Sequence, residues 1–249
     1  MDGCFYIEGL FLYKYCTMFV FYCTEIHGNT ITLSGDDARH CAKVLRKRPG
    51  DPILLTDGRG TLAKASLTHV SPSDCVAEVL ERNTIPPRRI ALHLAVAPTK
   101  NADRMEWLTE KAVELGVERI TFIICDHSER RKIDLDRMHR IAIAALKQSQ
   151  TAWLPELQCV DFQDFIKQNK DIPCRYVAWC DEHNTVQFAD EQWSEGEILL
   201  LIGPEGDFST EEINLCKSLG YKEVKLGSRR LRTETAALFG CFTVALRNA

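Results

Sequence analysis

A pair of adjacent prolines, Pro86 and Pro87, divides the chain into two parts with different sequence patterns. A double proline cannot continue a sheet and stiffens a linker. Before the pair, short strand-like segments alternate with turn signals; after it, strands alternate with helical segments. We therefore predict two domains, residues 18–86 and residues 87–249. We interpret residues 1–17 as an N-terminal extension of the reading frame, because a more natural strand begins at Met18.

The first part is predicted to form a small β-barrel. Strand-like segments occupy residues 30–33, 52–56 and 75–80, and glycine-containing turns separate them. Strands this close together are typical of small barrels. One helix is predicted to interrupt them, from Asp36 or Asp37 through Arg48, because its start is acidic and its end is basic.

The second part is predicted to be an α/β layer with a mostly parallel sheet, since strands and helices alternate along it. The predicted strands lie at residues 90–96, 119–125, 176–179, 197–202 and 223–226. The predicted helices lie at about residues 101–115, 134–149, 209–220 and 233–246. Asn101 and Ser209 are suitable helix caps, and Gly116 and Gly220 are suitable helix ends.

Composition excludes several classes of protein. Hydrophobic residues make up 45% and charged residues 27% of the 249 positions, as in ordinary globular domains. The longest apolar stretches are shorter than the roughly 18 residues that a membrane span needs, so no membrane contact is expected. The 11 cysteines include no CxxC pair and no zinc-finger spacing. We expect reduced thiols, no metal site and a cytoplasmic location.

Basic residues gather locally, although the whole chain carries a net charge of -4. Any RNA contact must therefore use a local patch. The longest basic run lies just before Asp51 and contains Arg39, His40, Lys43, Arg46, Lys47 and Arg48. A second basic region follows, with Arg130 and Arg131. These residues fit a phosphate-contacting surface, and they fit equally well a helix face that is merely solvated.

The first candidate ligand loop follows an apolar strand and reads Gly203-Pro204-Glu205-Gly206. Ligands of open α/β sheets bind at the carboxyl ends of strands, where such loops expose backbone groups. Glycines leave room for a ligand against the backbone. The carboxylate of Glu205 disfavours a phosphate and favours a cationic or hydroxyl-bearing ligand. A plain connection between a strand and a helix is the alternative.

The second candidate loop follows Leu226-Gly227 and carries three arginines, Arg229, Arg230 and Arg232, just before Glu234. It also lies between a strand and a helix, so it should open at the same edge of the sheet as the first loop. Together the two loops would make a pocket with backbone contacts, acids and guanidinium groups. The alternative is a solvated run of charges.

Taken together, these stretches resemble the RsmE family of the SPOUT superfamily, the S-adenosylmethionine-dependent RNA methyltransferases. The resemblance runs from about Met18 to Leu246. The most specific pieces are Gly203-Pro204-Glu205-Gly206 and the stretch from Leu226-Gly227 to Ala236. Supporting pieces are His40 to Arg48, Leu55-Thr56-Asp57-Gly58, Lys100 to Glu114 and Gln148-Ser149.

The resemblance implies the fold and the partners. It implies a PUA-like β-barrel domain for RNA binding, followed by a SPOUT-type α/β domain with a C-terminal deep trefoil knot. It also implies a homodimer formed through the SPOUT domain. The implied substrate is N3 of a uridine in 16S ribosomal RNA within the small subunit, and Lys100 joins the basic residues above as an implied RNA contact. Asp207 departs from the family pattern, which usually has a second glycine there, and Thr151 stands near a position that is often basic.

The resemblance also implies a cofactor site for S-adenosylmethionine, formed by Leu201, Gly203, Glu205, Gly206, Leu226, Gly227, Leu231, Thr235 and Ala236. Uridine N3 carries a proton and is a poor nucleophile until that proton leaves, so catalysis needs a base or a cation beside it. We expect Arg232 to supply the cation and Glu234 to orient it or to accept the proton. A structural ion pair within the knot is the alternative.

Three alternative functions stay open. The first is a related methyltransferase acting on a ribose 2′-hydroxyl or on a transfer RNA base. The second is an RNA-binding assembly factor that kept the fold without turnover. The third is a nucleotide-dependent metabolic enzyme, which the absence of any phosphate-binding loop disfavours.

Overall fold

A computed structural model describes residues 18–179 and 185–249, so the interpretation of residues 1–17 as an extension lies outside the described residues. The described chain forms two compact units. The first contains Pro87 and the residues before it, together with Leu146–Leu154 and Ala249. The second contains Arg88–Ala145 and Pro155–Asn248. The first unit is therefore discontinuous in sequence.

A five-stranded sheet in the order β1-β3-β4-β5-β2 forms the first unit. Its strands are β1 (Val20–Tyr22), β2 (Thr30–Ser34), β3 (Pro52–Thr56), β4 (Thr61–Val70) and β5 (Asp74–Thr84). β1 pairs with β3 in parallel, and all other pairs are antiparallel. Alternate residues of β2, Ile31 and Leu33, are buried in the core of this sheet, as a half-buried strand requires. The described strands of the expected barrel therefore form one sheet, with β1 and β2 at its two edges.

The helix predicted through Arg48 is shorter than expected. It consists of α2 (Gly35–Arg39) followed by a π-helical turn, η1 (His40–Val44). The Leu45 N–H donates to the His40 carbonyl at 2.9 Å, a hydrogen bond that spans five residues. Arg46 then adopts a left-handed φ of 51°, which ends the helix. The helix-like charge pattern beyond Val44 therefore belongs to a loop.

Six parallel strands in the order β11-β9-β10-β6-β7-β8 form the sheet of the second unit. They are β6 (Ile90–Val96), β7 (Arg119–Ile124), β8 (Glu156–Asp161), β9 (Cys174–Ala178), β10 (Gly196–Ile202) and β11 (Lys222–Val224). This is the parallel α/β layer expected from the alternation of strands and helices. The expected trefoil knot concerns the path of the chain through its own loops and stays a prediction.

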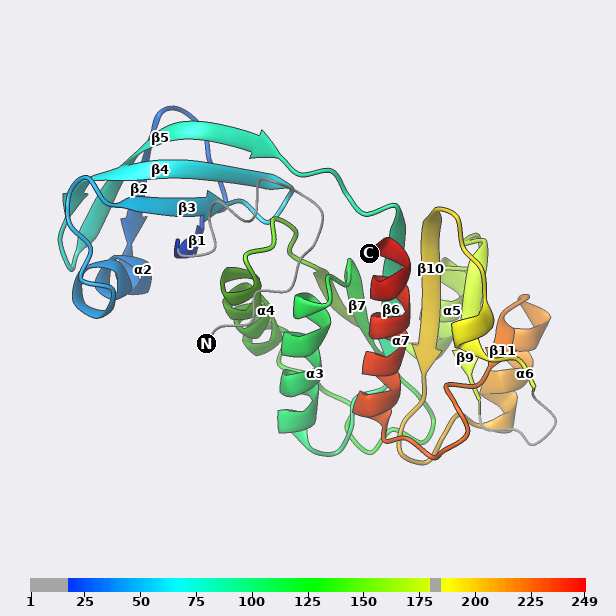
Figure 1. The fold of residues 1–249 in the computed structure, drawn as a ribbon. Coiled ribbons are helices and arrows are strands. Elements are labelled where there is room, and N and C mark those ends of the chain that lie inside the picture. The colour runs from blue at the N-terminus through cyan, green and yellow to red at the C-terminus, as the bar shows by residue number, and fades with distance from the viewer. Residues whose placement is uncertain (1–17, 180–184) are drawn as a thin grey trace. The chain divides into compact units, whose positions relative to one another are not determined.

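Helices cover both faces of this sheet, as a parallel sheet requires (Figure 1). One face is covered by α3 (Ala102–Glu114), α4 (Leu135–Ser149) and α7 (Thr233–Asn248), the other by α5 (Phe162–Gln168) and α6 (Thr210–Ser218). The sequence pattern predicted all the strands and helices of this unit except strand β8 and helix α5. No helix of the described residues combines the length and apolar character that crossing a membrane requires.

Helix α7 lies close against strand β10 at Gly240. A Cβ atom at this position would lie 2.2 Å from Cδ2 of Leu200, a residue that is fully buried. Leu200 belongs to the core cluster that α7 shares with β6 and β10. The absence of a side chain at Gly240 thus sets the distance between this helix and this strand.

A histidine is buried inside the same sheet. His93 on β6 is fully buried, and its Nε2 lies 2.7 Å from Oγ1 of Thr121 on β7. Among the described residues, its Nδ1 has no hydrogen-bond partner. Burial, aided by the cation of Arg119, lowers the pKa of His93 to about 3. The imidazole is therefore neutral in the folded protein at any pH well above 3.

We predict that His93 makes the protein less stable in mild acid. The unfolded chain protonates this imidazole near pH 6.5 and the folded chain does not, so stability falls as pH drops from 6.5 toward 3. The loss is at most about 1.4 kcal/mol per pH unit. Urea denaturation at pH 7.5, 6.5 and 5.5 measures it. His93→Gln should show a shallower pH dependence than the wild type, and His139→Gln, on the exposed surface of α4, controls for losing one histidine. Equal slopes for all three proteins would contradict the prediction.

Candidate active site

The two loops singled out in the sequence meet in one pocket. Residues 203–209 follow β10 and lead into α6, and residues 225–232 follow β11 and lead into α7. Only β9 lies between these two parallel strands, so both loops open at the same edge of the sheet. The pocket between them measures about 980 Å³, and Ala178 and Trp179 at the end of β9 also line it.

Hydrogen bonds hold the β11 loop in place. The Gly227 N–H donates to Oε1 of Gln187 at 3.2 Å, and the Lys225 N–H donates to the Val186 carbonyl at 2.7 Å. The Thr233 hydroxyl donates to the Gly203 carbonyl at 3.1 Å and so joins the two loops directly. Gly227 has a φ of 108°, which side chains disfavour, and a Cβ there would meet no atom within 4 Å. Its backbone therefore faces open space.

A second set of contacts holds the β10 loop from the side of β7. Nδ1 of His127 lies 3.2 Å from the Gly206 carbonyl and 3.0 Å from the Asp207 carbonyl, so the tautomer with its hydrogen on Nδ1 donates to both. Asp207 has a left-handed φ of 63°, and its Oδ1 accepts a hydrogen bond from the Phe208 N–H at 2.9 Å. Asp207 thus adopts the backbone conformation that a glycine would adopt more easily.

The loop then enters α6 through the capping box expected from the sequence. The Ser209 hydroxyl accepts from the Glu212 N–H, and the Glu212 carboxylate accepts from the Ser209 N–H at 2.8 Å. The other Glu212 oxygen accepts from the Asp126 N–H at 2.9 Å. The loop after β7 and the loop after β10 are therefore fastened together at one carboxylate.

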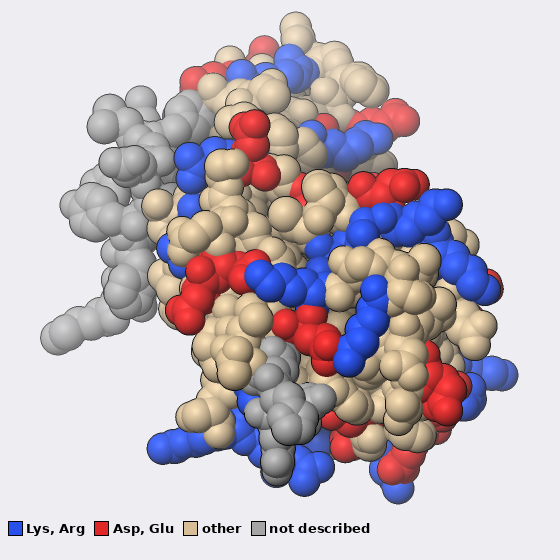
Figure 2. Space-filling model, turned by 90° about the vertical axis from the view of Figure 1, so that its right-hand side faces the viewer, with Lys and Arg blue, Asp and Glu red and all other residues tan. Residues whose placement is uncertain are grey.

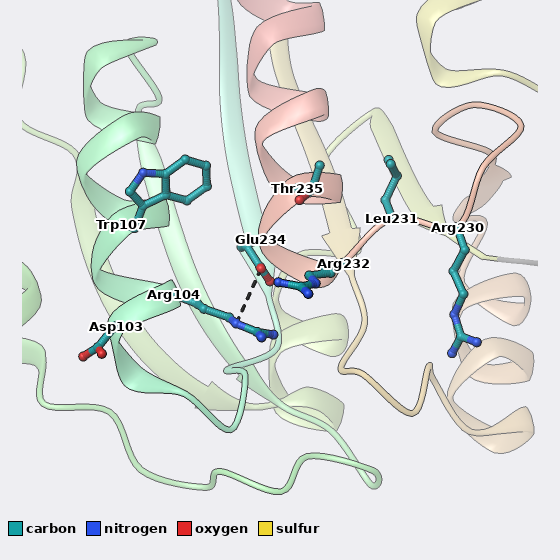
Figure 3. A pocket seen from close by; sticks show the side chains of 8 residues that line it. All are labelled: Asp103, Arg104, Trp107, Arg230, Leu231, Arg232, Glu234 and Thr235. Carbon is teal, nitrogen blue, oxygen red and sulfur yellow. Dashed lines mark ion pairs between the residues drawn. The ribbon is translucent and has the colours of Figure 1, made fainter.

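A smaller pocket of about 640 Å³ adjoins the first (Figure 3). Its lining residues are Asp103, Arg104, Trp107, Arg230, Leu231, Arg232, Glu234 and Thr235. The Glu234 side chain is only 8% exposed; its Oε1 lies 3.7 Å from Nε of Arg104, and its Oε2 has no hydrogen-bond partner among the described residues. Glu234 therefore brings to the wall of this pocket a buried carboxylate with one oxygen unpaired among the described residues.

The pockets contain most of the residues expected to bind a cofactor. Gly203, Glu205, Leu226, Gly227, Leu231 and Ala236 line the larger pocket, and Thr235 lines the smaller one. Leu201 and Gly206 line neither, because Leu201 is buried within β10 and Gly206 packs against His127. The expected catalytic residues are also placed here: Arg232 lines both pockets and Glu234 the smaller.

Sequence reasoning missed Arg104 and Trp107. Both lie on α3, three residues apart, and therefore on the same face of the helix. Trp107 is 47% exposed although the rest of the helix packs an apolar face into the core. The sequence signal that could have indicated them is a tryptophan on the polar face of an amphipathic helix, one turn away from an arginine.

Two family models match the chain. One, described as an RNA methyltransferase domain, covers residues 86–245, and the other, described as an RNA methyltransferase PUA domain, covers residues 33–80. The chain is 30% identical to the ribosomal RNA small subunit methyltransferase E of Mesomycoplasma hyopneumoniae, over 70% of this chain and 78% of that protein. It is 28% identical to the protein of the same name from Rickettsia conorii, over 87% and 89%.

The chain belongs to the RsmE family of RNA methyltransferases.

Solved structures agree with this assignment. A probable rRNA-methyltransferase from Porphyromonas gingivalis superposes with a TM-score of 0.85 at 37% identity, covering 93% of this chain and 98% of the other. A ribosomal RNA small subunit methyltransferase E from Neisseria gonorrhoeae, bound to S-adenosyl methionine, gives a TM-score of 0.80 at 29% identity, covering 90% and 95%.

The basic residues named for RNA binding fall into two groups in this RsmE-family chain. Six of them lie in the first unit, on α2, η1 and the loop that follows: Arg39, His40, Lys43, Arg46, Lys47 and Arg48. Lys47 is only partly exposed, and its ammonium lies 5.8 Å from the centre of the Phe19 ring.

The other three basic residues lie in the second unit, on the loops after β6 and β7. The Arg130 guanidinium donates to the Lys100 carbonyl at 2.9 Å, which brings these two residues together. Nζ of Lys100 pairs with Glu129 at 2.9 Å, and this contact raises the pKa of Lys100. Arg131 donates to the Asp126 carbonyl. Figure 2 shows Lys and Arg side chains interspersed with Asp and Glu side chains over the face that it draws.

We predict that glycine and alanine substituted at position 207 differ in their effect on stability, because the backbone there has a left-handed φ. Asp207→Ala keeps a Cβ at a left-handed φ and removes the side-chain oxygen that accepts from the Phe208 N–H, so it should lower the free energy of unfolding by about 1 to 2 kcal/mol. Asp207→Gly should be more stable than Asp207→Ala by about 1 kcal/mol.

Urea denaturation measures both Asp207 variants. The same two substitutions at Asp171, an exposed residue without a positive φ, provide the control, and there glycine should not exceed alanine. If Asp207→Gly and Asp207→Ala have the same free energy of unfolding, the left-handed backbone at position 207 does not determine which residue is preferred there.

Proposed function

We propose that this chain is an S-adenosylmethionine-dependent methyltransferase that methylates N3 of a specific uridine in 16S ribosomal RNA of the small subunit. The observation that supports it most is the pocket between the loops after β10 and β11, with Arg232 and Glu234 at its side. The function named for the relatives supports the same substrate class. The reaction would then take place in the cytoplasm, where ribosomal subunits are.

The larger pocket fits S-adenosylmethionine. Its volume of about 980 Å³ lies within the range of small-molecule sites. The backbone at Gly227 is open to a ligand, and Ile202, Val224 and Leu226 supply apolar lining. The lining carries charges of both signs, because the carboxylates of Glu205 and Asp207 stand beside Lys225 and four arginines. This mixture suits a ligand that has both positively charged groups and a carboxylate. The residues proposed to form this site are Leu201, Gly203, Glu205, Gly206, Leu226, Gly227, Leu231, Thr235 and Ala236.

When bound, S-adenosylmethionine supplies an electrophilic methyl group on a positively charged sulfur. The chain's own residues must then make uridine N3 nucleophilic. Arg232 lines both pockets, which supports the role of its guanidinium in stabilising a uridine anion. Glu234 is buried and has one oxygen without a donor among the described residues, which supports its role in accepting the N3 proton or in orienting Arg232.

Methyl mapping tests the proposal. Small subunits from a strain that lacks the enzyme are incubated with the purified protein and labelled cofactor, and nucleosides from the product are identified by mass spectrometry. We expect 3-methyluridine at one position. Arg232→Ala should lower kcat at least 100-fold while the cofactor Kd, measured by calorimetry, changes less than threefold.

Other results would identify the alternatives. A methylated ribose or a product in transfer RNA would make the chain a methyltransferase of another site. Cofactor binding without any methyl transfer, or no cofactor binding, would favour the assembly factor. If Arg232→Ala keeps full transfer and full cofactor affinity, Arg232 is not catalytic.

The basic residues of both units are proposed to contact the RNA. The net charge of -4 means that this contact depends on local patches, which suits a large preassembled ribonucleoprotein better than any single RNA strand. Arg46 and Arg48 follow the π-helical turn, and both are exposed. Neither side chain forms an ion pair with a carboxylate among the described residues.

A homodimer is also proposed, with α7 at its interface. Phe239, Phe242 and Leu246 are 37%, 53% and 58% exposed, and their spacing places them on one face of this helix. Three large apolar side chains in a row on one helix are typical of a surface that a partner covers. A second copy of the chain would present the same stripe.

We predict that Phe242→Glu yields monomers. A carboxylate in an apolar contact loses its hydration, so the dimer should dissociate at least 100-fold more readily. Sedimentation equilibrium at micromolar concentration measures the mass. Val44→Glu changes an equally exposed apolar residue of the first unit and should leave the mass unchanged. A wild-type protein that is monomeric, or a Phe242→Glu variant that stays dimeric, would overturn the interface.

A further inference from the structure

The smaller pocket is a separate space that shares a wall with the cofactor pocket. Arg104, Arg230, Leu231 and Arg232 line both spaces. The residues found only in the smaller one include Trp107 and Glu234. A molecule in this pocket therefore lies beside the proposed methyl donor and touches a different set of side chains.

The polar groups of the smaller pocket combine one acceptor with two donors. Glu234 supplies the acceptor; its side chain is more than nine-tenths buried, and its Oε2 has no hydrogen-bond donor among the described residues. Arg104 and Arg232, which only donate, line the same pocket, and Figure 3 draws both guanidinium groups beside this carboxylate. Nε of Arg104 lies 3.7 Å from Oε1 of Glu234.

This pattern is complementary to uracil. The edge of uracil that contains N3 presents the O2 acceptor, the N3–H donor and the O4 acceptor. Cytosine presents an acceptor at N3 and a donor at N4. A carboxylate facing N3 would then meet another acceptor, and a guanidinium facing N4 would meet another donor, so neither hydrogen bond could form. Leaving buried polar groups unpaired in this way is the strongest means of rejecting a ligand.

Trp107 supplies the remaining element of base recognition. Its indole is 47% exposed, lies one helical turn from Arg104 and lines the same pocket. Nucleobases taken out of a helix stack on aromatic side chains, at about 1 to 3 kcal/mol per base. Asp103 and Arg230 are exposed at the rim of the pocket. Arg230 forms no ion pair with a carboxylate among the described residues, so it can meet a flanking phosphate.

We propose that the smaller pocket binds the extruded uracil ring, with Trp107 stacking on its face, Arg104 and Arg232 donating to O2 and O4, and Glu234 accepting from N3–H. This inference rests on the proposed methyltransferase function. It makes Arg104 and Trp107 specificity-determining residues and explains how the site distinguishes uracil from cytosine.

Indole resonances test the binding directly. The chain has four tryptophans, and the Nε1–H signal of Trp107 is assigned by its loss in Trp107→Phe. With saturating cofactor, uridine 5′-monophosphate should shift this signal at a concentration at least fivefold lower than cytidine 5′-monophosphate. Arg104→Gln should remove that difference. Equal shifts by the two nucleotides, or no shift at Trp107, would overturn the proposal.

Kinetics separate this inference from the proposed function. Arg104→Gln and Trp107→Ala should each lower kcat/KM for small subunits at least tenfold. Trp107 lines only the smaller pocket, so Trp107→Ala should leave the calorimetric cofactor Kd unchanged within threefold. Trp107→Phe should recover most of the loss, because it keeps an aromatic face. Lys167→Gln removes an exposed cation of α5 outside both pockets and is the matched control.

The two ideas fail in different ways. A wild-type protein that methylates no RNA refutes the proposed function. A wild-type protein that forms 3-methyluridine while Arg104→Gln and Trp107→Ala keep its kcat/KM refutes the uracil site alone. Loss of folding in a variant is detected by its cofactor Kd, and the nucleotide titration of the wild type remains decisive in that case.

Discussion

The parallel direction of β9, β10 and β11 is the constraint on which the rest of the site depends. Because all three strands end at one edge of the sheet, loops that are about 20 residues apart in sequence open side by side. The hydrogen bond from Thr233 to the Gly203 carbonyl then joins them. A reversed strand would send one of the loops to the opposite edge, and neither pocket would form.

Much of the second unit could be predicted from local sequence because local interactions determine it. Helix α3 begins at Asn101, whose side chain accepts from the Asp103 N–H, and is followed by Gly116 at a φ of 77°. The capping box of α6 was equally clear. The end of the first helix was predicted wrongly, because the basic residues after Val44 continue a helical charge pattern while the backbone has already turned at Arg46.

The site was predicted in part, for a physical reason. Its loop residues carry glycines and arginines in a recognisable order, so the sequence indicated them. Arg104 and Trp107 come from α3, more than 100 residues earlier than Glu234, and only the packing of α3 beside α7 brings them to the pocket. An amphipathic helix does not reveal which of its exposed residues another element will approach. The path of the chain that makes a knot is likewise absent from local patterns.

The close approach of α7 to β10 at Gly240 gives this position an influence far from its own surroundings. The helix carries Glu234 and Thr235 in its first turn, and the strand continues into Gly203. The contact between Gly240 and Leu200, about two helical turns from Glu234, therefore sets the distance between the start of α7 and the end of β10, and with it the width of the cleft. A family member with a larger residue at this position would need a smaller one in place of Leu200 to keep the same cleft.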